Sequence, residues 1–241
     1  MLGGKAAVIP AAQTVTHHAD CEYPFRQNSD FWYLTGLDEP DAVALFLPQK
    51  NDNERFILFV IPKEPGEEVW NGFRWGVEGV LDEFGADKAH PIDELADLLS
   101  GYLQGAEGIV FRVGKHSKVE PLVLQAWSQQ LDQFHRIGSG ALVLQPPCPI
   151  LHQLRMRKDS EEIERMKEAA RISAEAHVHA REAIRPGMNE REVQALIEEY
   201  FLRAGARGPA YGTIVAGGDN ACVLHYTSNN SLLRDGDLLL I

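Results

Sequence analysis

Histidine and acidic side chains are the first candidates for chemistry in this sequence, because they are the usual ligands of a hydrolytic metal ion. His17 and His18 are adjacent, so their rings should point to opposite sides of an extended segment. His177 and His179 stand two apart on a predicted helix, roughly 200° round its axis, and cannot share one ion. No His-Glu-x-x-His motif occurs. We therefore expect residues 1–241 to contain no metal site of their own.

His225 is a candidate for contact with a substrate. It lies in a predicted strand, Cys222 to Tyr226, after the turn Gly217-Gly218-Asp219-Asn220. A glycine-rich turn beside a histidine can shape a pocket that binds a polar substrate atom. A histidine that is merely hydrogen-bonded on a half-exposed strand fits the same residues, so both interpretations stay open at this point.

Three cysteines are present, an odd number without any Cys-x-x-Cys spacing. This excludes a disulfide framework and a cysteine zinc site, and it fits the reducing cytoplasm. Cys222 lies near His225 in sequence, but we expect a buried, inert thiol rather than a nucleophile. Neither a P-loop nor a GxGxxG or GxSxG pattern occurs, which gives no support to phosphate binding or serine hydrolysis.

Trp70, Phe73 and Trp75 lie among glycines and charges, which is not a regular core pattern. They could form an aromatic wall for a ligand or a subunit contact, or pack locally under a loop.

The formal net charge of −12 and the pI of about 5.2 argue against a nucleic-acid partner and against an anionic membrane surface. The sequence contains no apolar run long enough for a membrane span, and its N-terminus lacks the hydrophobic core of a signal peptide. These features predict a cytoplasmic protein.

The first part of the chain predicts an α/β domain with a mixed sheet over residues 1–147. Expected strands are 6–9, 31–34, 42–47, 56–61 and 108–113, the third and fourth forming a hairpin. Helical patterns lie around 80–84, 92–103 and 122–134. Pro146, Pro147 and Pro149 interrupt regular structure and suggest a linker.

Residues 150–241 read as the opening part of an α+β domain. Asp159 or Ser160 should cap one helix, and Asn189 with Glu192 forms a capping box for the next. Strands are expected at 213–215 and 222–226. A turn at Asp235-Gly236-Asp237 then leads into an apolar run in which the chain stops, so we expect these residues to be part of a longer protein.

Several segments together resemble the Xaa-Pro aminopeptidases, the aminopeptidase P group of the creatinase and methionine aminopeptidase superfamily. They occur in the order found in that family, across nearly the whole chain. The matching segments are Tyr23-Pro24-Phe25-Arg26-Gln27-Asn28-Ser29-Asp30-Phe31-Trp32-Tyr33-Leu34-Thr35-Gly36, Glu39-Pro40-Asp41-Ala42, Glu68-Val69-Trp70, Arg185-Pro186-Gly187-Met188, Tyr211-Gly212-Thr213-Ile214-Val215, Leu224-His225-Tyr226 and Arg234-Asp235-Gly236-Asp237.

The resemblance implies a creatinase-type N-terminal domain followed by a pita-bread catalytic domain. It implies removal of the N-terminal residue from peptides with proline second, by a water bridging two divalent ions, usually manganese. The ions are held by two aspartates, one histidine and two glutamates, the first of which would follow Ile241. His225 matches a histidine that contacts substrate near the metals, and Tyr211 lies in a segment that lines the pocket. Trp70 matches an aromatic residue that closes the active site of a neighbouring subunit, which implies a homo-oligomer, a dimer or a tetramer.

The resemblance also implies a helix before the strand at Ala6, which the sequence lacks, and an arginine where Cys148 stands. We expect the 241 residues alone to be inactive, because all the metal ligands would lie beyond them. The alternative from a different class is a non-catalytic pita-bread module that binds or assembles with other proteins. The sequence that follows Ile241 would discriminate the two, since only the enzyme needs an aspartate directly there.

Overall fold

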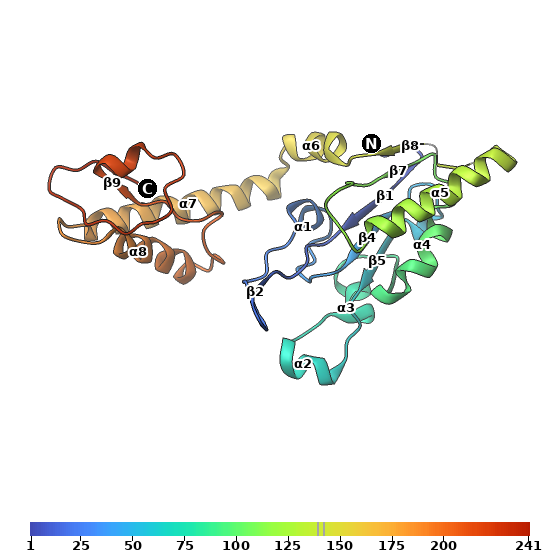
Figure 1. Cartoon of the computed structure of the whole chain (residues 1–241), viewed down its shortest axis with the longest axis horizontal. Helices are drawn as coiled ribbons and strands as arrows, with labels where there is room; N and C mark the ends of the chain where they lie inside the picture. Colours follow the sequence, from blue (N-terminus) through green and yellow to red (C-terminus); the bar gives the residue numbers. More distant parts are fainter. Residues whose placement is uncertain (139, 142) are drawn as a thin grey trace. The chain divides into compact units, whose positions relative to one another are not determined.

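The apolar run near the N-terminus forms β1 (Lys5–Pro10), a central strand of a six-stranded mixed sheet. Its five residues from Ala6 to Pro10 are buried, which explains a continuous rather than alternating apolar pattern. The strand order is β6-β5-β4-β1-β7-β8, and β4 and β5 form the predicted antiparallel hairpin (Figure 1). The other strands are β4 (Val43–Phe46), β5 (Phe56–Val60), β6 (Lys88–Pro91), β7 (Gly108–Val110) and β8 (Val143–Gln145).

Helices cover both faces of this sheet, so the α/β expectation for this part of the chain is confirmed. On one face α4 (Leu95–Leu103) and α5 (Glu120–Ile137) contribute Leu99 and Val123 to the core. On the other face α1 (Ser29–Thr35) and α3 (Gly76–Glu83) contribute Phe31 and Val80.

The strand predicted at 31–34 is wrong, because these residues belong to α1. The Asn28 side chain accepts hydrogen bonds from the backbone N–H groups of Asp30 and Phe31, which starts a helix. Gly36, with φ of 70°, ends it in the left-handed conformation. Local capping therefore overrides the β propensity of an aromatic run.

The computed structural model describes residues 1–138, 140–141 and 143–241, and it divides into two compact units, Met1–Met156 and Arg157–Ile241. We refer to them as unit 1 and unit 2. Helix α6 (Cys148–Met156) begins inside the proline-rich segment, because the first turn of a helix tolerates proline at Pro149. The predicted domains, 1–147 and 150–241, stay a prediction.

Unit 2 is built on two helices with capping boxes, α7 (Ser160–Ala183) and α8 (Glu190–Arg203). Of the two residues predicted to cap the first helix, Asp159 does so, and Asn189 caps the second as predicted. Ala176, Ala180, Val193 and Ile197 form the core between them. A short antiparallel pair, β9 (Ala216–Gly217) and β10 (Leu239–Leu240), packs beside the helices. The predicted turn before β10 is present, closed by the Asp237 backbone N–H donating to the Arg234 carbonyl.

The strands predicted at 213–215 and 222–226 are not formed. A 3-10 helix, η3 (Gly218–Cys222), interrupts the region, and the following residues turn at Leu224 and His225. The physical reason is that Asn220 and Tyr226 both bind the buried carboxylate of Glu190 and also bind each other, so the segment between them folds back instead of extending.

The remaining short elements of unit 1 are η1 (Asp52–Glu54), η2 (Ile92–Glu94), α2 (Pro65–Asn71) and the hairpin of β2 (Thr16–His18) with β3 (Cys21–Glu22). The hairpin carries an irregularity between Thr16 and His18. As a result the His17 and His18 rings meet edge to face at 5.2 Å, and the expectation that they point apart is wrong. In the described part of the chain, no helix is both long and apolar enough to cross a membrane.

Candidate functional site

The buried carboxylate of Glu190, the first residue of α8, organises the loops of unit 2. It is 0% exposed. Oε1 accepts hydrogen bonds from Gly217 N (2.9 Å) and Asn220 Nδ2 (3.1 Å). Oε2 accepts from the Tyr226 hydroxyl (2.8 Å) and Ser231 N (2.9 Å). One carboxylate thus joins four points of a segment that lies 27 to 41 residues further along the chain.

These hydrogen bonds decide the charge of Glu190. Burial by itself raises the pKa of a carboxyl group, but the backbone donors Gly217 and Ser231, with Asn220 and Tyr226, outweigh it and lower the pKa. The group is therefore a stable anion. Its position in the first turn of α8 adds the favourable field of the helix N-terminus.

His225 lies between two residues that Glu190 holds. Asn220 and Tyr226 both bind the carboxylate, and the Asn220 amide also donates to the Tyr226 hydroxyl at 3.1 Å. The backbone N–H of Val223 donates to the Asn220 carbonyl. His225 itself is exposed, at a turn. The loop is thus fixed on both sides of an imidazole that is accessible to solvent, which is an arrangement suited to binding a polar atom of a ligand.

Asn229 fixes the segment that carries Tyr211. It is 1% exposed and its φ of 44° is left-handed. Its amide donates to the Thr213 carbonyl and to Gln194 Oε1, and its oxygen accepts from Val215 N. The Thr213 hydroxyl is held in turn by Glu198 at 2.6 Å. Every polar atom of the Asn229 side chain is thereby used for structure.

Tyr211 is 76% exposed, beside a cavity of about 390 Å³ in unit 2. His177, Phe201 and Leu240 also line this cavity. His225 is not among its lining residues, so the structure does not unite the two predicted substrate contacts in one cavity. Both residues nevertheless belong to the segment that Glu190 and Asn229 hold.

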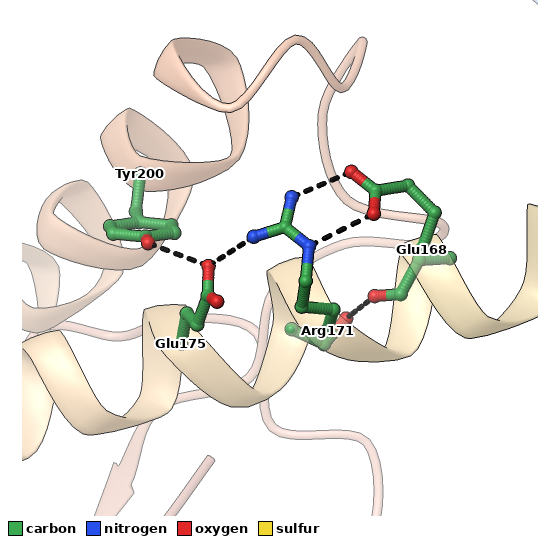
Figure 2. Close-up of polar contacts among 6 residues, drawn as sticks. Glu168, Arg171, Glu175 and Tyr200 are labelled. Carbon is green, nitrogen blue, oxygen red and sulfur yellow. Dashed lines mark hydrogen bonds and ion pairs between the residues drawn. The ribbon is translucent and has the colours of Figure 1, made fainter.

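An exposed network of charges joins the two helices of unit 2 (Figure 2). The Arg171 guanidinium binds Glu168 with two nitrogens, at 2.9 and 2.6 Å, and Glu175 with the third, at 2.5 Å. Glu175 on α7 also accepts from the Tyr200 hydroxyl on α8 at 3.0 Å. Arg171 and Tyr200 lower the pKa of Glu175, so this bridge between α7 and α8 carries a charge.

Trp70, the third predicted site residue, lies in unit 1 on α2 and is 86% exposed. Val69 and Phe73 beside it are also exposed. Trp75 instead packs edge to face with Phe73 and Phe84, with ring centroids 5.0 and 5.3 Å apart. The two interpretations of this sequence therefore divide between residues: Trp75 packs locally, whereas Trp70 is free to contact something else.

The possible metal ligands of this chain lie apart from one another. Within residues 1–138, 140–141 and 143–241, no three His, Cys, Asp or Glu side chains converge to bind an ion. Of the histidines considered for a site, His179 packs against Tyr200 and His177 lines the cavity of unit 2. The described residues do not fit a dinuclear metal centre.

The three cysteines are free thiols. Cys21 and Cys222 are exposed, so the expectation that Cys222 is buried is wrong. The reason is again the absence of the predicted strand, because η3 places Cys222 at the surface.

Sequence reasoning missed Glu190 and Asn229, which hold the segments that carry His225 and Tyr211. Glu190 follows a helix cap, where an acidic residue is expected for the helix dipole alone. A usable signal was available in Asn229 and Asn230, since asparagine favours the left-handed conformation that Asn229 adopts. The partners of both residues are distant in sequence, so the sequence alone could not pair them.

Two parts of the chain match known protein families. Residues 1–111 match the N-terminal domain of aminopeptidase P, and residues 164–241 match metallopeptidase family M24. Among curated relatives, the Xaa-Pro aminopeptidase of Escherichia coli K12 is 38% identical over 246 residues, covering 100% of this chain and 55% of the relative. The Xaa-Pro aminopeptidase of Haemophilus influenzae is 40% identical over 222 residues, covering 92% and 49%.

Solved structures of aminopeptidase P from bacteria have the same fold as this chain over nearly its whole length. Aminopeptidase PepP of Pseudomonas aeruginosa has a TM-score of 0.90 at 36% identity, covering 98% of this chain and 53% of its own. Zinc-substituted Escherichia coli aminopeptidase P in complex with product has a TM-score of 0.92 at 37% identity, covering 100% and 55%. The chain spans about half the length of the curated relatives it matches.

Proposed function

The chain belongs to the aminopeptidase P group of metallopeptidases, and from that premise we propose that the whole protein removes the N-terminal residue from peptides with proline in second position. The curated relatives with 38–40% identity carry the name of this activity. One observation connects the proposal to particular residues. Glu190 binds Asn220 and Tyr226, and the loop between them exposes His225 to solvent.

In this proposal His225 binds a polar atom of the substrate and stabilises charge that develops on it. An imidazole can donate or accept a hydrogen bond, and a preorganised donor contributes more in the transition state than a mobile one. Tyr211 contributes contact area beside the cavity of unit 2. Neither residue is an activated nucleophile, so their role is binding and orientation.

The hydrolytic power would come from two divalent ions, which we propose to be manganese, by activating a bridging water. The described residues supply no ligand set for these ions. We therefore assign the ligands to the part of the relatives' length that this chain does not span. Residues 1–241 alone should not hydrolyse peptides.

Trp70 fits a role at the edge of the active site of a second subunit in a homo-oligomer, a dimer or a tetramer. An exposed tryptophan flanked by exposed Val69 and Phe73 is an apolar surface that favours association. We also propose a cytoplasmic location, since the three cysteines are free thiols.

The first test uses the whole protein with manganese and compares a peptide bearing proline second with the same peptide bearing alanine there. We expect His225→Ala to lower kcat about 10²-fold without changing the unfolding midpoint, because a contact specific to the transition state is lost. His135→Ala, an exposed histidine of unit 1, is the matched control and should keep full activity. Unchanged kinetics in His225→Ala would assign this histidine to structure.

The second test assays the 241-residue chain with manganese on the same peptides. We expect no turnover above a blank that contains only the metal. Turnover would mean that residues 1–241 bind catalytic metal by themselves, which contradicts the assignment of the ligands. An inactive whole protein that instead binds another protein would favour the assembly module.

A further inference from the structure

The segment from Lys63 to Gly76, which we call the aromatic arm, is closed at its base. Gly76 has φ of 63°, and a Cβ placed on it would lie 2.7 Å from the Lys63 Cβ and 3.0 Å from the Lys63 backbone nitrogen. The two ends of the arm therefore touch, and only glycine fits at the return point. The tip exposes Trp70, Val69 and Phe73, at 86%, 81% and 64%.

Contacts made by Glu68 and Lys63 hold the aromatic arm together internally. Glu68 Oε1 accepts from the Arg74 backbone N–H at 3.0 Å and lies 3.7 Å from the Lys63 ammonium. The same ammonium lies 4.6 Å from the centre of the Phe73 ring, a cation–π distance. These contacts define the shape of the arm, but they do not fix its direction relative to the sheet of unit 1.

Glu39 makes a polar connection from the arm to the body of unit 1. Its Oε1 accepts a hydrogen bond from the backbone N–H of Trp75 at 2.8 Å. Glu39 is 7% exposed, in the segment between α1 and β4. The Trp75 ring packs against Phe84, the C-cap of α3, so the same residue is held by its backbone and by its side chain.

The acceptor is itself rigidly held. Gln27 Nε2 donates to the carbonyls of Glu39 at 2.8 Å and Leu37 at 3.1 Å. Gln27 Oε1 accepts from the backbone N–H groups of Ala12 and Asn28, at 2.7 and 2.8 Å. The Gln27 amide thus ties the backbone that carries Glu39 to the residues that follow β1 and to the N-cap of α1.

The chemistry of Glu39 is unusual for a residue that only stabilises a fold. Its Oε2 is buried without a hydrogen-bond partner among the described residues. Burial raises the pKa of this carboxyl group, while the Trp75 N–H and the Arg74 charge act in the opposite direction. A buried carboxylate with a single hydrogen bond contributes little net stability, so its consequence lies in what it positions.

We propose that Glu39 is a positioning residue that holds the aromatic arm, and with it Trp70, in one orientation toward a peptide substrate. The proposal rests on the function proposed above for Trp70. It assigns to Glu39 no contact with the substrate. The Trp75 N–H is the point of action, five residues from Trp70 along the arm.

Trypsin provides the direct test on the 241-residue chain, since the Arg74–Trp75 bond is the one whose N–H Glu39 holds. We expect Glu39→Ala to speed cleavage at this bond about tenfold, the effect of losing one hydrogen bond of ordinary strength. Glu39→Gln keeps a carbonyl acceptor of the same length and should stay near the rate of the unaltered chain. Ile109→Val, a mild core change in β7, controls for general loss of stability and should leave this rate unchanged.

Equal cleavage rates in Glu39→Ala and the unaltered chain would overturn the proposal, as would an equal increase in Ile109→Val. If Glu39→Ala does not fold, hydrogen exchange in the unaltered chain decides. A Trp75 amide that is protected from exchange supports the hydrogen bond to Glu39. An amide that exchanges at the rate of an unfolded chain overturns the proposal.

Kinetics of the whole protein separate this proposal from the proposed function. We expect Glu39→Ala to raise KM several-fold for a proline peptide with a smaller change in kcat, Glu39→Gln to restore KM, and Glu39→Ala to add nothing to Trp70→Ala. If the unaltered protein does not cleave such peptides, the proposed function fails. The trypsin result still decides whether Glu39 holds the aromatic arm. If it does cleave them and Glu39→Ala leaves KM unchanged, the positioning role is overturned.

Discussion

Each unit of this protein contains a buried glutamate at a point that matters for the candidate site, and the two are built in opposite ways. Glu190 of unit 2 is fully buried and accepts four hydrogen bonds. Glu39 of unit 1 is almost as buried and accepts one, with its second oxygen unpartnered. The pKa of the first is lowered and the pKa of the second is raised. Burial alone therefore does not set the charge of a carboxyl group; the number of donors does.

The contrast separates two tasks. A carboxylate bound on all sides fixes a loop, which suits His225 as a preorganised contact. A carboxylate that accepts one hydrogen bond holds the aromatic arm at a single point, the Trp75 N–H, which suits the proposed positioning of Trp70. Glu190 is a structural anion, and Glu39 attaches the aromatic arm to unit 1 through one hydrogen bond.

The largest expected effect comes from Glu190→Ala, which removes the acceptor of four hydrogen bonds. We expect unit 2 to lose about 3 kcal/mol or more of unfolding free energy. All four tryptophans lie in unit 1, so tryptophan fluorescence during urea unfolding reports unit 1, whereas far-UV circular dichroism reports both units. The loss should appear in the dichroism transition alone.

Glu199→Ala is the matched control, an exposed glutamate of the same helix whose partner is Arg203. Its dichroism midpoint should stay close to that of the unaltered chain. If Glu190→Ala behaves like this control, Glu190 is not the organising group of unit 2.

A smaller effect is expected for Asn229→Ala, about 2 kcal/mol in the unfolding of unit 2. The change removes three hydrogen bonds and leaves alanine at a left-handed φ of 44°. Asn230→Ala is the control, because among the described residues Asn230 is bound through its backbone carbonyl, which accepts from the Asn189 amide. Similar midpoints for the two variants would show that the Asn229 side chain does not hold the Tyr211 segment.

The two glutamates should respond to pH with opposite signs. Because the folded pKa of Glu190 lies below its ordinary value of 4.5, its stabilisation is present above that pH and is lost as pH falls through the folded pKa. The folded pKa of Glu39 lies above 4.5, so its contribution is complete below that pH and is lost as pH rises through the folded pKa.

The measurement compares the unaltered chain with Glu190→Gln and Glu39→Gln by urea unfolding across this pH range. The advantage of the unaltered chain over Glu190→Gln should shrink in acid. Its advantage over Glu39→Gln should shrink toward neutral pH. If both stability differences changed with pH in the same direction, the contrast between Glu190 and Glu39 would not hold.

The smallest effect is expected for Arg171→Ala, although its network is the most conspicuous in unit 2 (Figure 2). The side chains of Arg171, Glu168 and Glu175 are about half exposed, so water and salt screen their attraction. We expect a shift of the unfolding midpoint that is close to the error of the measurement and that disappears at high salt. A shift as large as that of Asn229→Ala would mean that the bridge to Tyr200 holds α8 in place.

Much of this architecture follows from local sequence. The N-caps of α7 and α8, the hairpin of β4 and β5, and the turn before β10 were predicted because their causes lie within a few residues. The strand predicted at 31–34 failed because an apolar aromatic run fits either period, and the cap at Asn28 decides between them.

The candidate site was predictable only in part. His225 and Trp70 could be selected through family resemblance, and both prove to be accessible. The groups that hold them could not be predicted, since Glu190 and Tyr226 are 36 residues apart and Glu39 and Trp75 are also 36 apart. The sequence alone does not show whether a glutamate side chain is exposed to water or accepts four hydrogen bonds in the interior.

The contact between Lys63 and Gly76 has a practical consequence for engineering. Because both ends of the arm already meet, replacing residues 64–74 with a short turn costs little closure entropy, keeps Trp75 against Phe84 and Glu39, and leaves the register of β5 and β6 intact. The arm can thus be treated as a removable cassette. Related proteins could exchange this segment on one scaffold, and any difference in peptide selectivity that follows the exchange would be attributable to eleven residues.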